Sequence, residues 1–259
     1  MSKHCLILLM IAIEPCLAHE FWLQPQRYTA VPGETVQVDW RIGMEFSGTP
    51  YVYLPDMATQ VAQFSDGQLR PLTPRFAAKP ALSVVMGAGT TIAVTESSDF
   101  TIEYEDKAAF ETFLSKEHLQ VNTDALADED QVIERYRRYA KALLTPPEQP
   151  WQDSRVGLAF EWVIAQQDTQ LKAQLFASDQ PAADLPVRLF VQRADGAVDS
   201  RLAQTDANGV VWFDDLSENN HYLLNAIRLY PIDPAANKDK ASWHSDWAST
   251  TFQWLNVTD

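Results

Sequence analysis

The chain of 259 residues carries a formal net charge of −15. This acidity argues against a nucleic-acid-binding protein, because such proteins gain affinity from cationic side chains that neutralise phosphates. It suits a globular protein whose electrostatic field attracts cations. The length allows one large domain or two modest ones.

The first 18 residues predict a secretory signal peptide. A short basic start precedes the apolar run Leu6–Ile13, and small residues at Cys16 and Ala18 fit a signal-peptidase site before His19. The run is too short for a transmembrane helix, which needs about 20 residues; a buried first strand or helix is the alternative. We therefore expect an exported mature protein, periplasmic or secreted, that does not span a membrane. Cys5 and Cys16 both fall inside the signal, so the mature chain would have no thiol chemistry.

Residues 19–165 predict an N-terminal β-sandwich. Val36, Val38 and Trp40 alternate with polar neighbours, which is the pattern of a half-buried strand. The turn at Pro32-Gly33 separates this strand from an earlier one. The expected strands are residues 20–28, 35–42, 51–54, 81–86, 90–95 and 100–104.

A helical insert is expected at about residues 107–145. Phe110, Phe113 and Leu114 form a short apolar stripe at helical spacing, and a longer one follows over residues 132–143. Glu134 and Arg138 stand four residues apart, as in a helical ion pair. Two prolines at 146 and 147 would end the helix.

Residues 166–259 predict a second sandwich, so the fold class is mostly β, with two β-sandwich units of immunoglobulin or transthyretin type and a helical insert. Asp195-Gly196 and Asn208-Gly209 supply turns between short strands. In one strand, Val211 and Phe213 should point to the side opposite Trp212. The expected strands are residues 171–176, 187–192, 210–213, 222–229 and 248–255.

Several segments resemble known families. The segment TDANGVVWF at 205–213 is similar to a signature of transthyretin-like and carboxypeptidase-regulatory-like sandwiches. The start HEFW at 19–22, the segments 110–119 and 134–144, and the ending WHSDWASTTF at 243–252 resemble an exported bacterial family. That family has a domain of unknown function and is described as NikM-like, after nickel and cobalt uptake. His118 stands where the family usually has glycine, and Arg228 stands where it often has histidine.

Histidines are the candidate metal ligands of the mature chain. An N-terminal His19 could chelate a metal through its α-amine and its ring Nδ1, and nitrogen ligands suit nickel, cobalt and copper. His244, between Trp243 and Trp247, and His221 are the further candidates, and His118 ends a helix beside Glu117. The sequence has no HExxH motif and no close histidine pair.

The sequence and the resemblance together favour a periplasmic transition-metal-binding accessory protein, not an enzyme, that serves metal uptake or delivery. Its partners would be a metal ion and a membrane transporter component. One alternative is a non-catalytic adaptor or binding module for a protein or glycan, with Trp243, Trp247 and Trp254 as an aromatic surface. Another is a copper enzyme that uses His19 in a histidine brace, which requires a second imidazole nearby.

Overall fold

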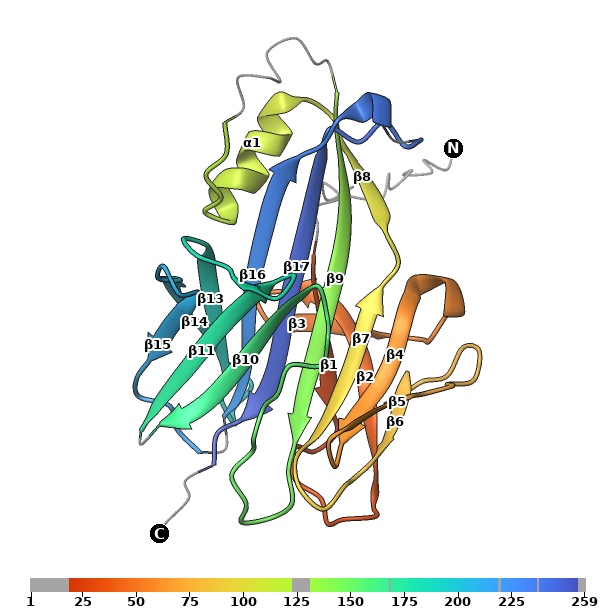
Figure 1. Cartoon of the computed structure of the whole chain (residues 1–259), viewed down its shortest axis with the longest axis vertical. Coiled ribbons are helices and arrows are strands. Elements are labelled where there is room, and N and C mark those ends of the chain that lie inside the picture. The colour runs from red at the N-terminus through yellow and green to blue at the C-terminus, as the bar shows by residue number, and fades with distance from the viewer. Residues whose placement is uncertain (1–18, 123–130, 168, 219, 237, 256–259) are drawn as a thin grey trace, which may run out of the picture.

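A computed structural model describes residues 19–122, 131–167, 169–218, 220–236 and 238–255 (Figure 1). The expected signal peptide, residues 1–18, lies outside the described residues. The chain is mostly β, which confirms the expected fold class. The helical elements are α1 (Lys107–Lys116) and the short 3₁₀ turns η1 (Pro55–Met57) and η3 (Pro234–Ala236).

The strands form three sheets. Their bounds are β1 (Glu20–Pro25), β2 (Thr35–Met44), β3 (Ser47–Tyr51), β4 (Ala58–Ser65), β5 (Gln68–Pro71), β6 (Leu82–Val85), β7 (Thr91–Ser97), β8 (Phe100–Tyr104), β9 (Val132–Leu144), β10 (Phe160–Gln167), β11 (Gln170–Ala177), β12 (Gln180–Pro181), β13 (Pro186–Gln192), β14 (Val198–Gln204), β15 (Val210–Phe213), β16 (His221–Pro231) and β17 (Trp243–Gln253).

Two smaller sheets pack against the opposite faces of one large central sheet. The central sheet has the order β14-β13-β16-β17-β9-β7-β4-β5, with β8 also paired to β9. A front sheet of β10-β11-β12 with β15 covers one face, and a back sheet of β1-β2-β3 with β6 covers the other. Figure 1 shows the front sheet crossing before the lower part of β16 and β17. The molecule is therefore two sandwiches built on one common sheet.

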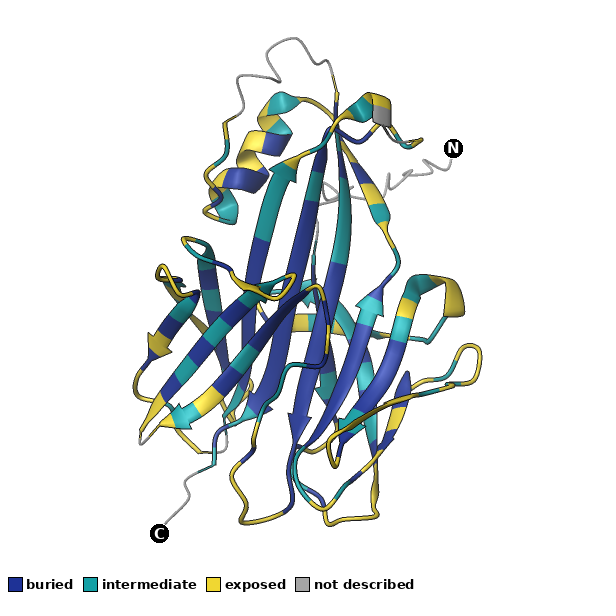
Figure 2. Cartoon of the chain, viewed as in Figure 1, coloured by how far each residue is buried: buried dark blue, intermediate teal, exposed yellow. Residues whose placement is uncertain are grey.

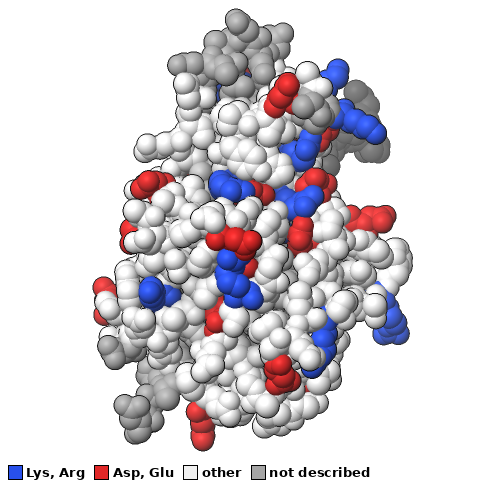
Figure 3. All heavy atoms as spheres, in the orientation of Figure 1, with Lys and Arg blue, Asp and Glu red and all other residues white. Residues whose placement is uncertain are grey.

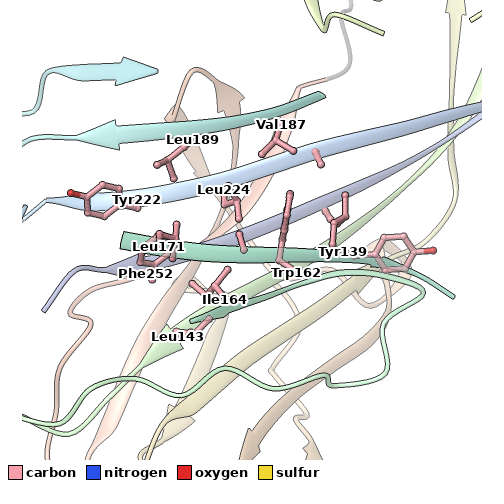
Figure 4. Packing of buried hydrophobic residues seen from close by; sticks show 14 of the residues in the cluster. Tyr139, Leu143, Trp162, Ile164, Leu171, Val187, Leu189, Tyr222, Leu224 and Phe252 are labelled. Atoms are coloured by element: carbon pink, nitrogen blue, oxygen red, sulfur yellow. The ribbon is translucent and has the colours of Figure 1, made fainter. Parts of the chain in front are cut away.

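The alternation of side chains along β17 shows which face of the central sheet each of the two smaller sheets covers. Ser249 Oγ donates to the carbonyl of Phe21 at 2.7 Å, so odd-numbered residues of β17 face the back sheet. The even-numbered Ala248 and Phe252 belong to the core shared with the front sheet. Figure 2 shows that the middle strands are buried over most of their length, and Figure 4 shows the front core, where Trp162 and Ile164 meet the central sheet.

The front sheet also confirms the expected orientation of one strand. Val211 and Phe213 of β15 are each 5% exposed, whereas Trp212 between them is 45% exposed. Strand alternation therefore holds at this segment, as the sequence predicted.

The expected helix over residues 132–144 is wrong, because this segment is the strand β9. β9 pairs in parallel with β17 and antiparallel with β7 and β8. From residue 138 to residue 144 it is buried on both faces, so its burial is continuous and the alternation of a half-buried strand is lost. Its valine, isoleucine and tyrosines favour strand. Among the described residues of the expected insert, α1 is the only helix.

The expected domain boundary between residues 165 and 166 falls inside β10. In addition, β9 from the first half pairs directly with β17 from the second half over nine residue pairs, from Trp243↔Glu134 to Thr251↔Ala142. The two sandwiches are thus joined through backbone hydrogen bonds within one sheet, and the two sequence halves do not form separate sheets.

Candidate functional site

His19 lies at the edge of the described chain, immediately before β1, and is partly exposed. Its carbonyl oxygen accepts a hydrogen bond from Arg138 Nη2 at 2.8 Å. With Met44, Gly48 and Tyr51, it lines an open surface hollow of about 610 Å³ beside the β2–β3 hairpin. The peptide group of His19 is therefore held in place beside an open hollow.

Glu20, Glu117 and Arg188 form a polar cluster next to His19, which we call the N-terminal corner together with His19. Glu20 is only 5% exposed. Burial, reinforced by the negative charge of Glu117, raises the pKa of Glu20 to about 7. Burial also raises the pKa of Glu117, although Arg188 Nη1 lies 3.5 Å from its Oε2. The neighbouring cations therefore do not offset the burial of these two carboxyl groups.

The β2–β3 turn supports Glu20 from the backbone. Glu45 and Phe46 both adopt left-handed conformations, with φ of 54° and 59°. Such a conformation costs a non-glycine residue about 1–2 kcal/mol. Phe46 offsets this cost because its ring is 2% exposed and packs edge-on against Trp22 at 5.6 Å. The turn then allows the backbone N–H of Glu45 to donate to the Glu20 carboxylate.

The other expected metal ligands lie elsewhere. His221 is at the start of β16 and its ring contacts Tyr28 at 4.8 Å. His244 pairs across the strands with Tyr230, nine residues further along β16 than His221, which places the two histidines roughly 30 Å apart. His244 also faces the front side of the central sheet, whereas His19 lies on the back side. The fold does not bring His19, His221 and His244 together.

His118 is the expected ligand nearest to the corner in sequence, since it follows Glu117. It is exposed and has a left-handed φ of 56°. It ends α1 in a Schellman motif, in which the N–H of Leu119 donates to the Leu114 carbonyl at 2.8 Å. Glycine is usual at this position because it adopts a left-handed conformation without strain. A histidine here therefore raises the energy of the backbone.

Among the described residues, no group of three or more His, Asp, Glu or Cys side chains is arranged to hold a metal ion. A chelate by His19 would use its α-amine, which is a backbone nitrogen and exists as a free group only after cleavage. The three tryptophans expected as an aromatic surface are core residues instead: Trp243, Trp247 and Trp254 are 1–2% exposed.

A second polar cluster lies around Asp246 on the opposite face of the central sheet. Asp246 is 3% exposed and accepts hydrogen bonds from Arg228, from His244 Nε2 at 3.2 Å and from Tyr139 at 3.4 Å. Burial alone would raise the pKa of Asp246, but the hydrogen bonds from His244 and Arg228 hold it below its usual value. Figure 3 shows acidic and basic groups interspersed on this face. His244 is thus engaged by its neighbours.

The sequence analysis missed the roles of Glu20, Glu117 and Arg188. The sequence contained one indication of the role of Glu20. Its carboxylate lies in a strand between a histidine and two aromatic residues, so it must be buried or lie at the edge of the sheet. No local sequence pattern indicated that Glu117 and Arg188 interact. They are 71 residues apart, and the packing of α1 against β13 brings them together.

The chain belongs to the family described as domain of unknown function DUF4198, whose profile matches residues 16–228. The match ends within β16, so β17 lies beyond it. No curated protein matches the chain.

Two solved structures align weakly. The first is a tetra-tandem repeat from the extending region of a large adhesion protein, with 11% identity and a TM-score of 0.22 over 91% of this chain and 49% of that one. The second is dimeric latent PorU from Porphyromonas gingivalis, with 11% identity and a TM-score of 0.19 over 90% of this chain and 20% of that one. The chain thus spans about half and a fifth of these two proteins. At such scores, neither informs the fold or function.

The described residues include no helix that is long and apolar enough to cross a membrane.

Proposed function

We propose that this protein is an exported, non-catalytic accessory protein that binds a transition metal for uptake or delivery in the periplasm. Its principal ligand is His19, through the α-amine and the ring Nδ1 of the processed N-terminus. A membrane transporter component would receive or supply the metal. The proposal follows the resemblance to nickel- and cobalt-uptake proteins, and the nitrogen donors also suit copper.

The observation that carries the proposal is the fixed position of His19 beside buried carboxyl groups. Arg138 anchors the His19 carbonyl at 2.8 Å, so the amine and ring of the same residue are presented from a constrained peptide group. A chelate loses less conformational entropy when its backbone is already ordered. Glu20, whose pKa is about 7, gains from a nearby cation, which favours metal at this position.

The proposed site has fewer candidate ligands than the sequence suggested. His221 and His244 do not contribute to it, since one lies beyond the far end of β1 and the other lies on the opposite face of the central sheet. The copper-enzyme alternative needs a second imidazole beside His19, and neither of these histidines is there. The proposed site is therefore an N-terminal chelate completed by the carboxylates of the corner or by water.

Calorimetric titration with nickel, cobalt and copper ions tests the proposal. The protein that begins at His19 should bind at least about tenfold more tightly than the same protein with one extra N-terminal alanine, because the extension removes the free amine and leaves the ring. His221→Ala is the matched control and should bind as the parent does. Equal affinity of the parent and the extended protein would show that the amine is not a ligand, and absence of binding in both would refute metal carriage.

Proton competition provides a second signature. Imidazole titrates near about pH 6.5 and an α-amine near about 8. Both groups must lose a proton to bind metal, so affinity should fall as the pH is lowered through this interval. An affinity that is constant between these values would contradict nitrogen ligation.

A further inference from the structure

A hollow of about 480 Å³ opens between the chain that follows α1 and the β13–β14 hairpin at the edge of the central sheet. Its lining is as polar as it is apolar. The apolar side chains include Leu119, Leu185, Pro186, Leu202 and Leu229, and the polar ones are His118, Gln120, Asp184 and Gln204. The volume is typical of small-molecule sites.

A smaller cavity of about 10 Å³ lies beside this hollow, and Pro186 and Leu202 line both. The small cavity has a polar lining that includes Glu117, Arg188 and Asn225. Arg188 and Asn225 are cross-strand neighbours on β13 and β16, and Glu117 reaches them from the end of α1. The larger hollow thus borders this smaller cavity, which we call the polar recess.

The polar recess presents acceptors. Asn225 is 4% exposed, and its side-chain oxygen has no hydrogen-bond partner among the described residues. A buried acceptor without a donor is costly, so the site favours any group that supplies one. Arg188 does not supply it, because its Nη2 donates to the Lys116 carbonyl at 2.9 Å and its Nη1 faces Glu117. The Glu117 carboxylate, only 9% exposed, is the second acceptor.

We propose that this hollow and recess bind an organic cation: a primary ammonium group donates to Asn225 Oδ1 and Glu117, and a compact apolar body fills the space beside Leu202. An ammonium group carries three donors and no acceptor, which matches a recess that offers acceptors. A carboxylate ligand would place acceptors against acceptors and a negative charge beside Glu117. The site shares Glu117 with the N-terminal corner, but it does not include the residues that line the His19 hollow and does not require metal.

Calorimetry on the mature protein with 2-phenylethylamine and n-hexylamine tests this proposal, with hexanoate as the anionic probe. We expect both amines to bind with a Kd on the order of 1 mM, which suits ligands of this size, and hexanoate not to bind. Asn225→Leu and Glu117→Gln should each weaken amine binding by about tenfold. Circular dichroism and thermal unfolding establish that each variant is folded.

Leu202→Ser is the variant least able to disturb the fold, since Leu202 is 53% exposed, and it removes the apolar contribution to binding without adding a charge. Leu69→Ser, at a 37% exposed position on β5, is the matched control and should bind as the parent does. His19→Ala should leave amine binding unchanged. Binding of hexanoate as tight as that of the amines, amine binding that is not weakened by Leu202→Ser, or no binding of either amine at about 10 mM would overturn the proposal.

Discussion

Two buried polar clusters differ in how completely their groups are paired. Lys141 is 1% exposed, and its three ammonium donors have three acceptors: Asp153 Oδ1 at 2.7 Å and the carbonyls of Ser154 and Trp162 at 3.1 and 2.6 Å. Burial raises the pKa of Asp153 there, as it raises the pKa of Glu20 and Glu117 in the N-terminal corner, but beside the corner Asn225 has an unpaired oxygen. A fully paired cluster stabilises the fold, whereas an incompletely paired one is available to a ligand.

Removing Lys141 should have the largest effect on stability. Lys141→Met leaves the fully buried carboxylate of Asp153 without its cation, and breaking a buried pair in this way costs about 3–5 kcal/mol. Urea unfolding should show this loss. Lys172→Met is the control, since Lys172 only lies over the exposed Trp212 ring at 5.7 Å, and should change stability by no more than about 1 kcal/mol. Similar losses in the two variants would contradict the structural role of the Lys141 cluster.

The corner should lose stability as the pH rises, because burial raises the pKa of Glu20. The pKa of Glu20 rises from 4.5 to about 7 on folding, so the folded state binds the proton more tightly. The stability from this group is fully present below about pH 4.5 and is lost as the pH rises through about 7. In metal-free buffer, Glu20→Gln should therefore raise the free energy of unfolding at pH 8 by about 3 kcal/mol and change it little at pH 4.5.

The exposed Glu103, changed to glutamine, is the matched control for Glu20. It should leave the pH dependence of urea unfolding as it is in the parent. A loss of stability in Glu20→Gln at pH 8 would show that the carboxylate is already compensated in the folded protein, and the contrast between the two clusters would fail.

The smallest expected effect is at His118. His118→Gly removes the backbone penalty of a left-handed residue at the end of α1 and should stabilise the protein by about 0.5–1 kcal/mol. The melting temperature should then rise by about 1–4 °C in scanning calorimetry. His118→Ala retains the left-handed strain and should show no such gain. A decrease in stability on His118→Gly would mean that the imidazole itself stabilises the corner.

The sequence predicted strands with one buried face and also several that are buried on both faces. β2 and β15 alternate cleanly and were predicted, including the outward side of Trp212. β7, β16 and β17 are buried on both faces and were predicted as well. β9 was taken for a helix because its buried run imitates a helical stripe. Strands β4, β5, β10, β12 and β14 were not predicted. Of these, β5, β12 and β14 are largely exposed edge strands that lack a buried apolar face. The shared central sheet could not be read from either half alone, because its neighbouring strands β9 and β17 come from different halves of the chain.

The site was predicted only in part. His19 stood out because of its position after an expected cleavage site, whereas its carboxylate neighbours required the packing of α1 against β13. His221 and His244 were chosen for their residue type, and the strand register that separates them is a long-range property. Residue type and position therefore pointed to His19 as a candidate chelating residue, but they did not predict which side chains lie around it.

NMR titration of the Glu20 carboxyl group, with and without one equivalent of zinc as a diamagnetic metal, tests the central claim most directly. The account predicts a midpoint near pH 7 in the metal-free protein, because burial raises the pKa of Glu20. Binding of the cation at His19 should then lower that midpoint, since a nearby positive charge favours the carboxylate. A midpoint near 4.5 that does not move when zinc is added would contradict the account.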